Sequence, residues 1–178
     1  MTAPNDKTLI QAVLDGDKTA YEQLYDRYAP LVRAVCYDTT GNITDAQDLA
    51  QDVFMRAYEK LEHLRNSERF GNWLTGIARL RCKEWRRQKL RNRDKKSELE
   101  NKDLIIADAP SDGQIERLRE MITTLPEQER LALHAFYLQN NSADSARKVL
   151  GLSRSGFYRV LERARKRLER LLTEKGDF

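Results

Sequence analysis

The residues of this sequence that most strongly indicate ligand binding are clustered cationic side chains, some of them mixed with aromatic ones. Residues 79–96 hold ten Lys and Arg against two acidic residues, and residues 154–170 hold seven against two. An acidic stretch, residues 97–120, separates the two basic blocks. Two spaced basic blocks predict two contacts with a polyanion, whereas the alternative is a pair of solvated helix faces.

Residue types that carry catalysis are sparse. The two histidines, His63 and His134, have no metal-ligand spacing, no Ser/His/Asp set is indicated, and there is no glycine-rich phosphate loop. The two cysteines, Cys36 and Cys82, have no CxxC spacing and indicate no disulfide framework. Arginines around Cys82 leave a redox role as a minor hypothesis, in which Cys82→Ser would abolish function; we expect little change instead. The sequence predicts no enzymatic activity, cofactor or metal.

Composition indicates a globular protein with small helical cores. Apolar residues make up 40% of the 178 residues and charged residues 34%, with a net charge of +4. No apolar run is long enough to span a bilayer, and the N-terminus does not read as a signal peptide. We therefore expect a cytoplasmic protein without membrane insertion.

Apolar periodicity predicts helices throughout the first half of the chain. Asp17 can cap a helix that contains Pro30 and ends at Gly41. Thr44 is predicted to start the next helix, with acidic residues in its first turns. After a break at residues 65–67, a third helix begins near Phe70 and continues into the first basic block.

The second half is predicted to be a separate helical unit. Ser142 can cap a short helix, Gly151 suits the left-handed residue that ends it, and Ser153 can cap a long amphipathic helix. We predict an all-α fold of two small domains: residues 1–92, a flexible linker at 93–113, and residues 114–178.

The short helix, turn and long helix have the layout of a helix-turn-helix, whose second helix enters the DNA major groove. Helical pairs with tight turns also occur in proteins that do not bind DNA. Arginines at the start of the long helix favour DNA, because arginine can bond guanine edges in a bidentate manner. The predicted contacts with DNA are Arg154, Ser155, Tyr158, Arg159, Arg163 and Lys166.

The first basic block mixes cations with Phe70, Trp73 and Trp85. Aromatic rings stack on unpaired bases while cations hold phosphates, so this mixture suits single-stranded or opened nucleic acid. Phe70 and Trp73 also fall on an apolar stripe, which favours a core role for both. Trp85 lies among charges and is the stronger candidate for a contact.

Several segments, in order, resemble the extracytoplasmic-function group of bacterial sigma factors over nearly the whole chain. GDKTAYEQLYDRYAPLV (16–32) is similar to the opening helix of sigma domain two. DAQDLAQDVFMRAY (45–58) is similar to its polymerase-binding helix, and FGNWLTGIAR (70–79) to its −10 helix. LPEQERLAL (125–133), LGLS (150–153) and RARKRL (163–168) resemble sigma domain four.

The resemblance implies a protein that binds core RNA polymerase at the β′ clamp and β flap and directs initiation at promoter DNA. A stand-alone helix-turn-helix regulator is the alternative. The implied clamp contacts are Asp45, Asp48, Gln51, Asp52 and Phe54, and Phe54 is equally a candidate for the core because it falls on the apolar stripe of its helix. The implied −10 contacts are Arg65, Asn66, Ser67, Arg79, Lys83, Arg86 and Arg87, to which we add Trp85. Exposed charged faces in the free protein also suggest an inhibitory anti-sigma partner.

The sequence departs from the family pattern at a few positions. Leu80 replaces the usual Asn and Glu84 the usual Asp in the −10 helix. In the helix-turn-helix, Arg147 stands where a small residue normally packs, and Gly156 and Val160 stand where Thr and Arg are usual. We expect an unaltered fold and an atypical reading of the −35 element, with Arg159 in place of the missing arginine.

Overall fold

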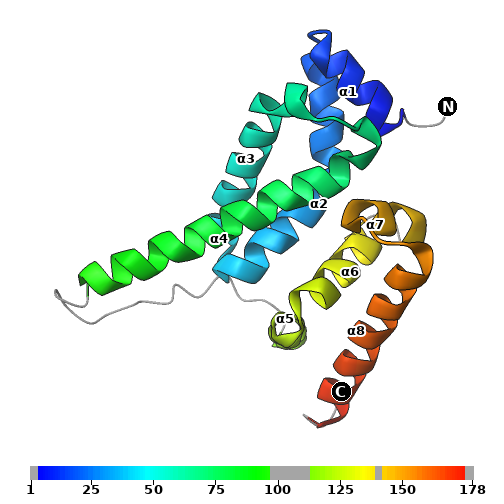
Figure 1. The fold of residues 1–178 in the computed structure, drawn as a ribbon. Coiled ribbons are helices and arrows are strands. Elements are labelled where there is room, and N and C mark those ends of the chain that lie inside the picture. The colour runs from blue at the N-terminus through cyan, green and yellow to red at the C-terminus, as the bar shows by residue number, and fades with distance from the viewer. Residues whose placement is uncertain (1–3, 97–112, 139–141, 175–178) are drawn as a thin grey trace.

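The computed structural model describes residues 4–96, 113–138 and 142–174, and every regular element in these ranges is helical. This result confirms the predicted all-α class. The elements, in chain order (Figure 1), are α1 (Asp6–Leu14), α2 (Lys18–Thr40), α3 (Ile43–Glu59), η1 (Leu61–His63), η2 (Ser67–Arg69), α4 (Phe70–Lys96), α5 (Gly113–Thr124), α6 (Glu127–Leu138), α7 (Ala143–Leu150) and α8 (Arg154–Glu174).

Side-chain caps start the helices close to where the sequence predicts. The carboxylate of Asp17 accepts the backbone N–H of Thr19 at 2.9 Å, and the hydroxyl of Ser142 accepts that of Ser145 at 3.2 Å. The prediction for Thr44 is wrong. Asn42 caps α3 instead, since its side-chain oxygen accepts the N–H of Asp45 at 2.9 Å.

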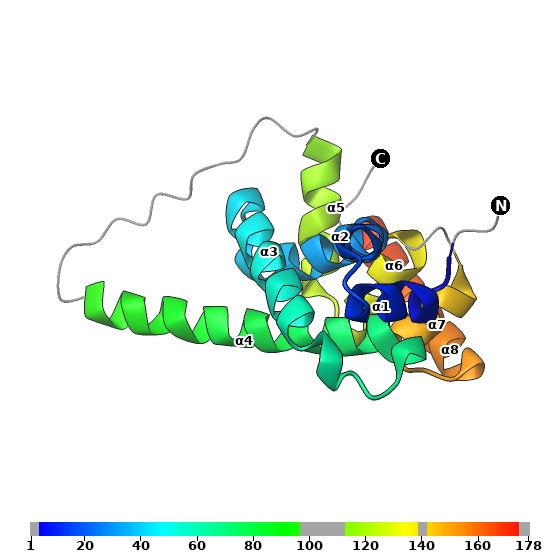
Figure 2. The ribbon, with the colours of Figure 1, turned by 90° about the horizontal axis from the view of Figure 1, so that it is seen from above.

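Helices α1 to α4 share one apolar core. Helix α2 packs along α3, and α4 crosses both. Leu24 and Val53 are fully buried between α2 and α3, and Phe70 and Leu74 anchor the first turns of α4. Each such side chain contributes about 1.5–3 kcal/mol by leaving water. The core therefore fixes the start of α4, whereas its C-terminal half projects beyond the other helices (Figure 2).

Helix α4 is also longer than expected. It continues to Lys96, four residues into the segment predicted as a linker, and the next described helix begins at Gly113. The rest of the predicted linker, residues 97–112, lies outside the described residues.

Helices α6, α7 and α8 form a second packed group around the fully buried Phe157 and Ala164 of α8. Gly151, with φ +66°, ends α7 in the left-handed conformation that lets the chain turn into α8. The hydroxyl of Ser153 then accepts the backbone N–H of Gly156 at 3.1 Å, as expected for a cap. The helix-turn-helix layout predicted from residues 142–172 is present.

The two helical groups pack directly on each other, and buried side chains run continuously from one to the other. Helix α4 contacts α7, and α2 contacts α6. At the second contact, Asp38 of α2 bonds Arg130 Nε at 2.9 Å and His134 Nε2 at 3.0 Å. All three side chains are at most 17% exposed. Partly buried charges need such partners to offset their desolvation.

Gly151 lies at the other contact, between α7 and α4, because a Cβ there would stand 2.7 Å from Asn72 Nδ2 on α4. We expect Gly151→Ala to lower the free energy of unfolding by about 1–2 kcal/mol through left-handed strain, with the close approach adding to the loss. Gly76→Ala is the matched control, since its Cβ would meet open space in a helix interior and should stabilise by about 0.5–1 kcal/mol. Thermal denaturation by circular dichroism measures both, and equal midpoints would contradict this assignment.

Candidate polymerase and nucleic-acid interfaces

Helix α3 presents an acidic face with an apolar residue beside it. Asp48 and Gln51 are exposed, and Met55, one turn after Gln51, is 57% exposed. Asp45 and Asp52 are half-buried and hold neighbouring cations: Asp45 pairs with Lys89 at 3.6 Å, and Asp52 pairs with Arg81. This face of α3 therefore combines two exposed polar side chains, Asp48 and Gln51, with two carboxylates that form ion pairs to α4.

Of the two roles expected for Phe54, the structure supports the core and not the clamp contact. It is 3% exposed and packs against Tyr25, with ring centroids 4.6 Å apart, and its backbone carbonyl accepts the hydroxyl of Tyr21 at 2.5 Å. Phe54 positions α3 from inside the core and presents no surface to a partner. Met55 is an additional exposed residue that was not predicted, although its exposure follows from its place four residues after Gln51 on the same helical face.

The short loop between η1 and α4 exposes Arg65 and Asn66, with Ser67 half-buried. The side chain of Asn66 accepts the backbone N–H of Glu68 at 3.0 Å, which gives the loop a fixed turn. A cleft of about 830 Å³ separates this loop from the α7–α8 turn, and its walls include Asn66, Arg69 and Ser153. The predicted −10 loop and the helix-turn-helix thus face each other across one cleft.

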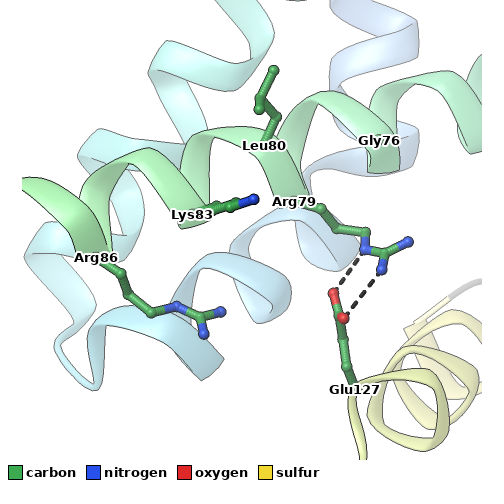
Figure 3. Close-up of a pocket in the computed structure, with 6 residues that line it drawn as sticks. All are labelled: Gly76, Arg79, Leu80, Lys83, Arg86 and Glu127. Atoms are coloured by element: carbon green, nitrogen blue, oxygen red, sulfur yellow. Dashed lines mark hydrogen bonds and ion pairs between the residues drawn. The ribbon is translucent and has the colours of Figure 1, made fainter.

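Helix α4 carries the predicted −10 cations along one side. Arg79, Lys83 and Arg86 are exposed at successive helical turns and line a pocket of about 520 Å³ with Leu80 and Glu127 (Figure 3). Arg79 donates to both carboxylate oxygens of Glu127 on α6, at 2.7 and 3.1 Å. The guanidinium of Arg79 is therefore already paired with a carboxylate of the second helical group.

Other residues of the first basic block divide between surface and core. Arg87 is exposed, and Trp85 is half-buried with the Lys89 ammonium 5.0 Å from its ring centre. Phe70 is fully buried against Tyr28, and Trp73 packs on Phe70. The core interpretation of Phe70 is confirmed, whereas Trp73 and Trp85 are both half-buried and pack against the core.

All the predicted contact residues of α8 lie on its solvent face: Arg154, Ser155, Tyr158, Arg159, Arg163 and Lys166. Their exposure follows from helical periodicity, because Phe157, Val160 and Leu161 fill the opposite face. Val160 is 4% exposed, so its position cannot present an arginine without rearrangement, and Arg159 stands exposed beside it.

The unusual Arg147 does not disturb the packing of α7. Ala146, its neighbour, is fully buried and supplies the small residue, while the Arg147 guanidinium bonds Asp144 at the surface. The backbone of α7 therefore reaches Gly151 as an ordinary helix.

Within residues 4–96, 113–138 and 142–174, no cluster of His, Cys, Asp and Glu could hold a metal ion. In the same ranges, no helix combines the length and apolar character needed to cross a membrane.

Comparison with known proteins accounts for both helical groups. Residues 24–92 match the family model for Sigma-70 region 2. Beyond that segment, the chain is 28% identical over 174 residues to the ECF RNA polymerase sigma factor SigF of Caulobacter vibrioides, covering 96% of each protein. The chain is therefore similar to ECF RNA polymerase sigma factors over nearly its whole length. It spans 38–42% of the length of three other curated relatives that it matches.

Solved structures agree with the fold. The chain of CnrH, in the complex with the cytosolic domain of CnrY, superposes with a TM-score of 0.66 at 22% identity, covering 96% of this chain and 99% of CnrH. RpoE of Bartonella quintana, in complex with the anti-sigma factor NepR, superposes with a TM-score of 0.59 at 22% identity, over 86% of this chain and 96% of RpoE.

Proposed function

We propose that this chain is a sigma factor of the ECF group, which binds core RNA polymerase and directs promoter-specific initiation through two DNA-binding surfaces. The observation that carries the proposal is the pair of exposed cationic helix faces, on α4 and α8, in a chain that also presents the acidic face of α3. A stand-alone helix-turn-helix regulator would use α8 but leaves the α3 face without a partner. The similarity to sigma factors, which includes region 2 as well as the second helical group, disfavours that alternative.

The proposed polymerase contacts lie on both helical groups. The surface for the β′ clamp consists of three exposed residues of α3, namely Asp48, Gln51 and Met55. Ile115 and Leu118 of α5 are 49% and 41% exposed, and we assign them to the apolar contact with the β flap. Exposed apolar side chains within a polar rim are typical of protein–protein interfaces.

The proposed DNA contacts act at two promoter elements. The 65–67 loop accepts a flipped base of the −10 element, and Lys83, Arg86 and Arg87 hold the phosphates of the unpaired strand. Flipping costs a few kcal/mol, which the phosphate contacts offset. Helix α8 reads the −35 element. The polymerase supplies all catalysis, and joining two weak contacts to one enzyme raises the effective concentration of each.

The arrangement described here must open before both DNA surfaces are used together. Glu127 occupies Arg79, and the 65–67 loop faces the α7–α8 turn. An anti-sigma partner in the cytoplasm would act by holding the two helical groups together. The RpoE–NepR complex supports the presence of such partners in this fold.

Binding to core polymerase without DNA tests the proposal against the stand-alone regulator. The purified chain, mixed with core enzyme, is expected to co-elute with it in size-exclusion chromatography. Separate elution at micromolar concentrations of both, together with binding of the chain alone to specific duplex DNA, would favour the regulator.

Two substitutions on α8 separate base reading from phosphate binding. Arg159→Ala is expected to cost about 1–3 kcal/mol of promoter affinity and to relax preference at one −35 position. Lys166→Ala should weaken binding evenly across sequences and reduce the salt dependence by about one phosphate contact. Holoenzyme binding to a set of −35 variants measures both effects. An unchanged sequence preference in Arg159→Ala would remove this residue from the reading surface.

A further inference from the structure

The two cysteines of the chain meet in the core between α2 and α4. Cys36 is fully buried and Cys82 is 2% exposed, and both are free thiols. The Cys82 thiol donates a hydrogen bond of 3.8 Å to the backbone carbonyl of Val35, the residue before Cys36, so it lies against the segment of α2 that carries Cys36. These residues are far apart in sequence, so only the packing of α4 across α2 brings them together.

The surroundings make the two thiols unequal. The hydrogen bond from Cys36, another from Thr39 and the nearby Arg86 guanidinium lower the pKa of Cys82 to about 7, against burial and the charge of Asp38. The same hydrogen bond, burial and the charges of Cys82 and Asp52 raise the pKa of Cys36 well above its usual range. Cys82 is therefore the nucleophile of the pair, and Cys36 keeps its proton.

We propose that Cys36 and Cys82 are an oxidisable dithiol, in which a hydroperoxide forms a disulfide that links α2 to α4. The Cys82 thiolate attacks the outer peroxide oxygen, the O–O bond breaks, and an alcohol or water leaves after protonation. The resulting Cys82 sulfenic acid is attacked by the Cys36 sulfur. An S–S bond forms, and the hydroxyl leaves as water with the Cys36 proton. The peroxide is reduced by two electrons and the two thiols are oxidised by two.

The position of the pair gives the link a structural consequence. Arg86, one of the exposed cations of α4, follows Cys82 by four residues, and its guanidinium lies 3.5 Å from the hydroxyl of Thr39, three residues after Cys36. A disulfide would fix the middle of α4 on α2 directly beneath this cation. Burial protects both thiols from large reagents, so a small hydroperoxide entering during local opening is the suitable oxidant. The inference goes beyond promoter recognition and holds whether or not the chain directs initiation.

Titration of the reduced, full-length protein with hydrogen peroxide tests the proposal. We expect both thiols to disappear together and a disulfide between the peptides containing Cys36 and Cys82 in non-reducing mass spectrometry, reversed by dithiothreitol. The rate of thiol loss should rise about tenfold from pH 6 to pH 8, as the Cys82 thiolate forms. Oxidation in urea is run in parallel, to separate reaction of the folded protein from reaction of the unfolded chain.

Cys36→Ala and Cys82→Ala are the matched variants, with circular dichroism to check that each remains folded. In Cys36→Ala, Cys82 should be trapped as a sulfenic acid by dimedone, while in Cys82→Ala the remaining thiol should react at least tenfold more slowly. The proposal is overturned if the folded wild-type protein keeps both thiols, or if the disulfide forms only in urea. Should a variant fail to fold, the wild-type cross-link and its pH profile decide alone.

Discussion

Replacing Asp48 by arginine is expected to weaken binding to core RNA polymerase by about 30-fold or more. Reversing one charge at a docked, complementary interface costs about 2 kcal/mol or more, which corresponds to that factor. Asp48 is the suitable position because it is exposed, whereas Asp45 and Asp52 also hold Lys89 and Arg81 within the fold. Fluorescence anisotropy of the labelled protein, titrated with core enzyme, measures the affinity.

The matched control is Glu22→Arg, which makes the same charge change at an exposed position of α2. Its affinity for core enzyme should stay within about twofold of wild type, since exposed charges away from an interface contribute little. If Asp48→Arg and Glu22→Arg bind core enzyme equally well, the acidic face of α3 is not the clamp contact. Thermal denaturation of both variants excludes a loss of fold as the cause.

Asp38→Asn is expected to loosen the contact between the two helical groups by about 2 kcal/mol. The substitution keeps the shape of the side chain but leaves Arg130 without the carboxylate that it contacts at 2.9 Å. Such a change shifts the balance between packed and separated arrangements by about 30-fold. Fluorescence energy transfer between dyes on α3 and α8 should fall, and the radius of gyration in small-angle scattering should rise.

Separation of the groups also exposes the −10 surface, because Arg79 leaves Glu127 when α6 moves away. Binding of Asp38→Asn to single-stranded −10 DNA should therefore strengthen by at least threefold. Asp26→Asn, an exposed change on the same helix, serves as the control and should alter neither measurement. Unchanged energy transfer in Asp38→Asn would mean that the ion cluster does not hold the groups together.

Features set by neighbouring residues were predictable from the sequence. The caps at Asp17 and Ser142 and the turn at Gly151 follow from hydrogen bonds or conformations confined to a few residues. The exposure of Arg159 and Lys166 follows from the periodicity of α8. The starting residue of α3 was misplaced because Asn42 and Thr44 are both acceptable caps, and only the backbone geometry decides between them.

Features that join distant segments were not predictable. Asp38 meets His134 on a helix that the sequence assigns to another domain, and Cys36 meets Cys82 only because α4 crosses α2. Periodicity places a residue on a face of its own helix, but tertiary packing decides what covers that face.

Run-off transcription with purified core RNA polymerase on a genomic DNA library tests promoter-directed initiation most directly. With this chain added, we predict transcripts that start downstream of a shared motif containing −10 and −35 elements, none of which core enzyme produces alone. If the chain does not bind core enzyme and does not bring about a defined start site on any fragment, it does not act as a sigma factor.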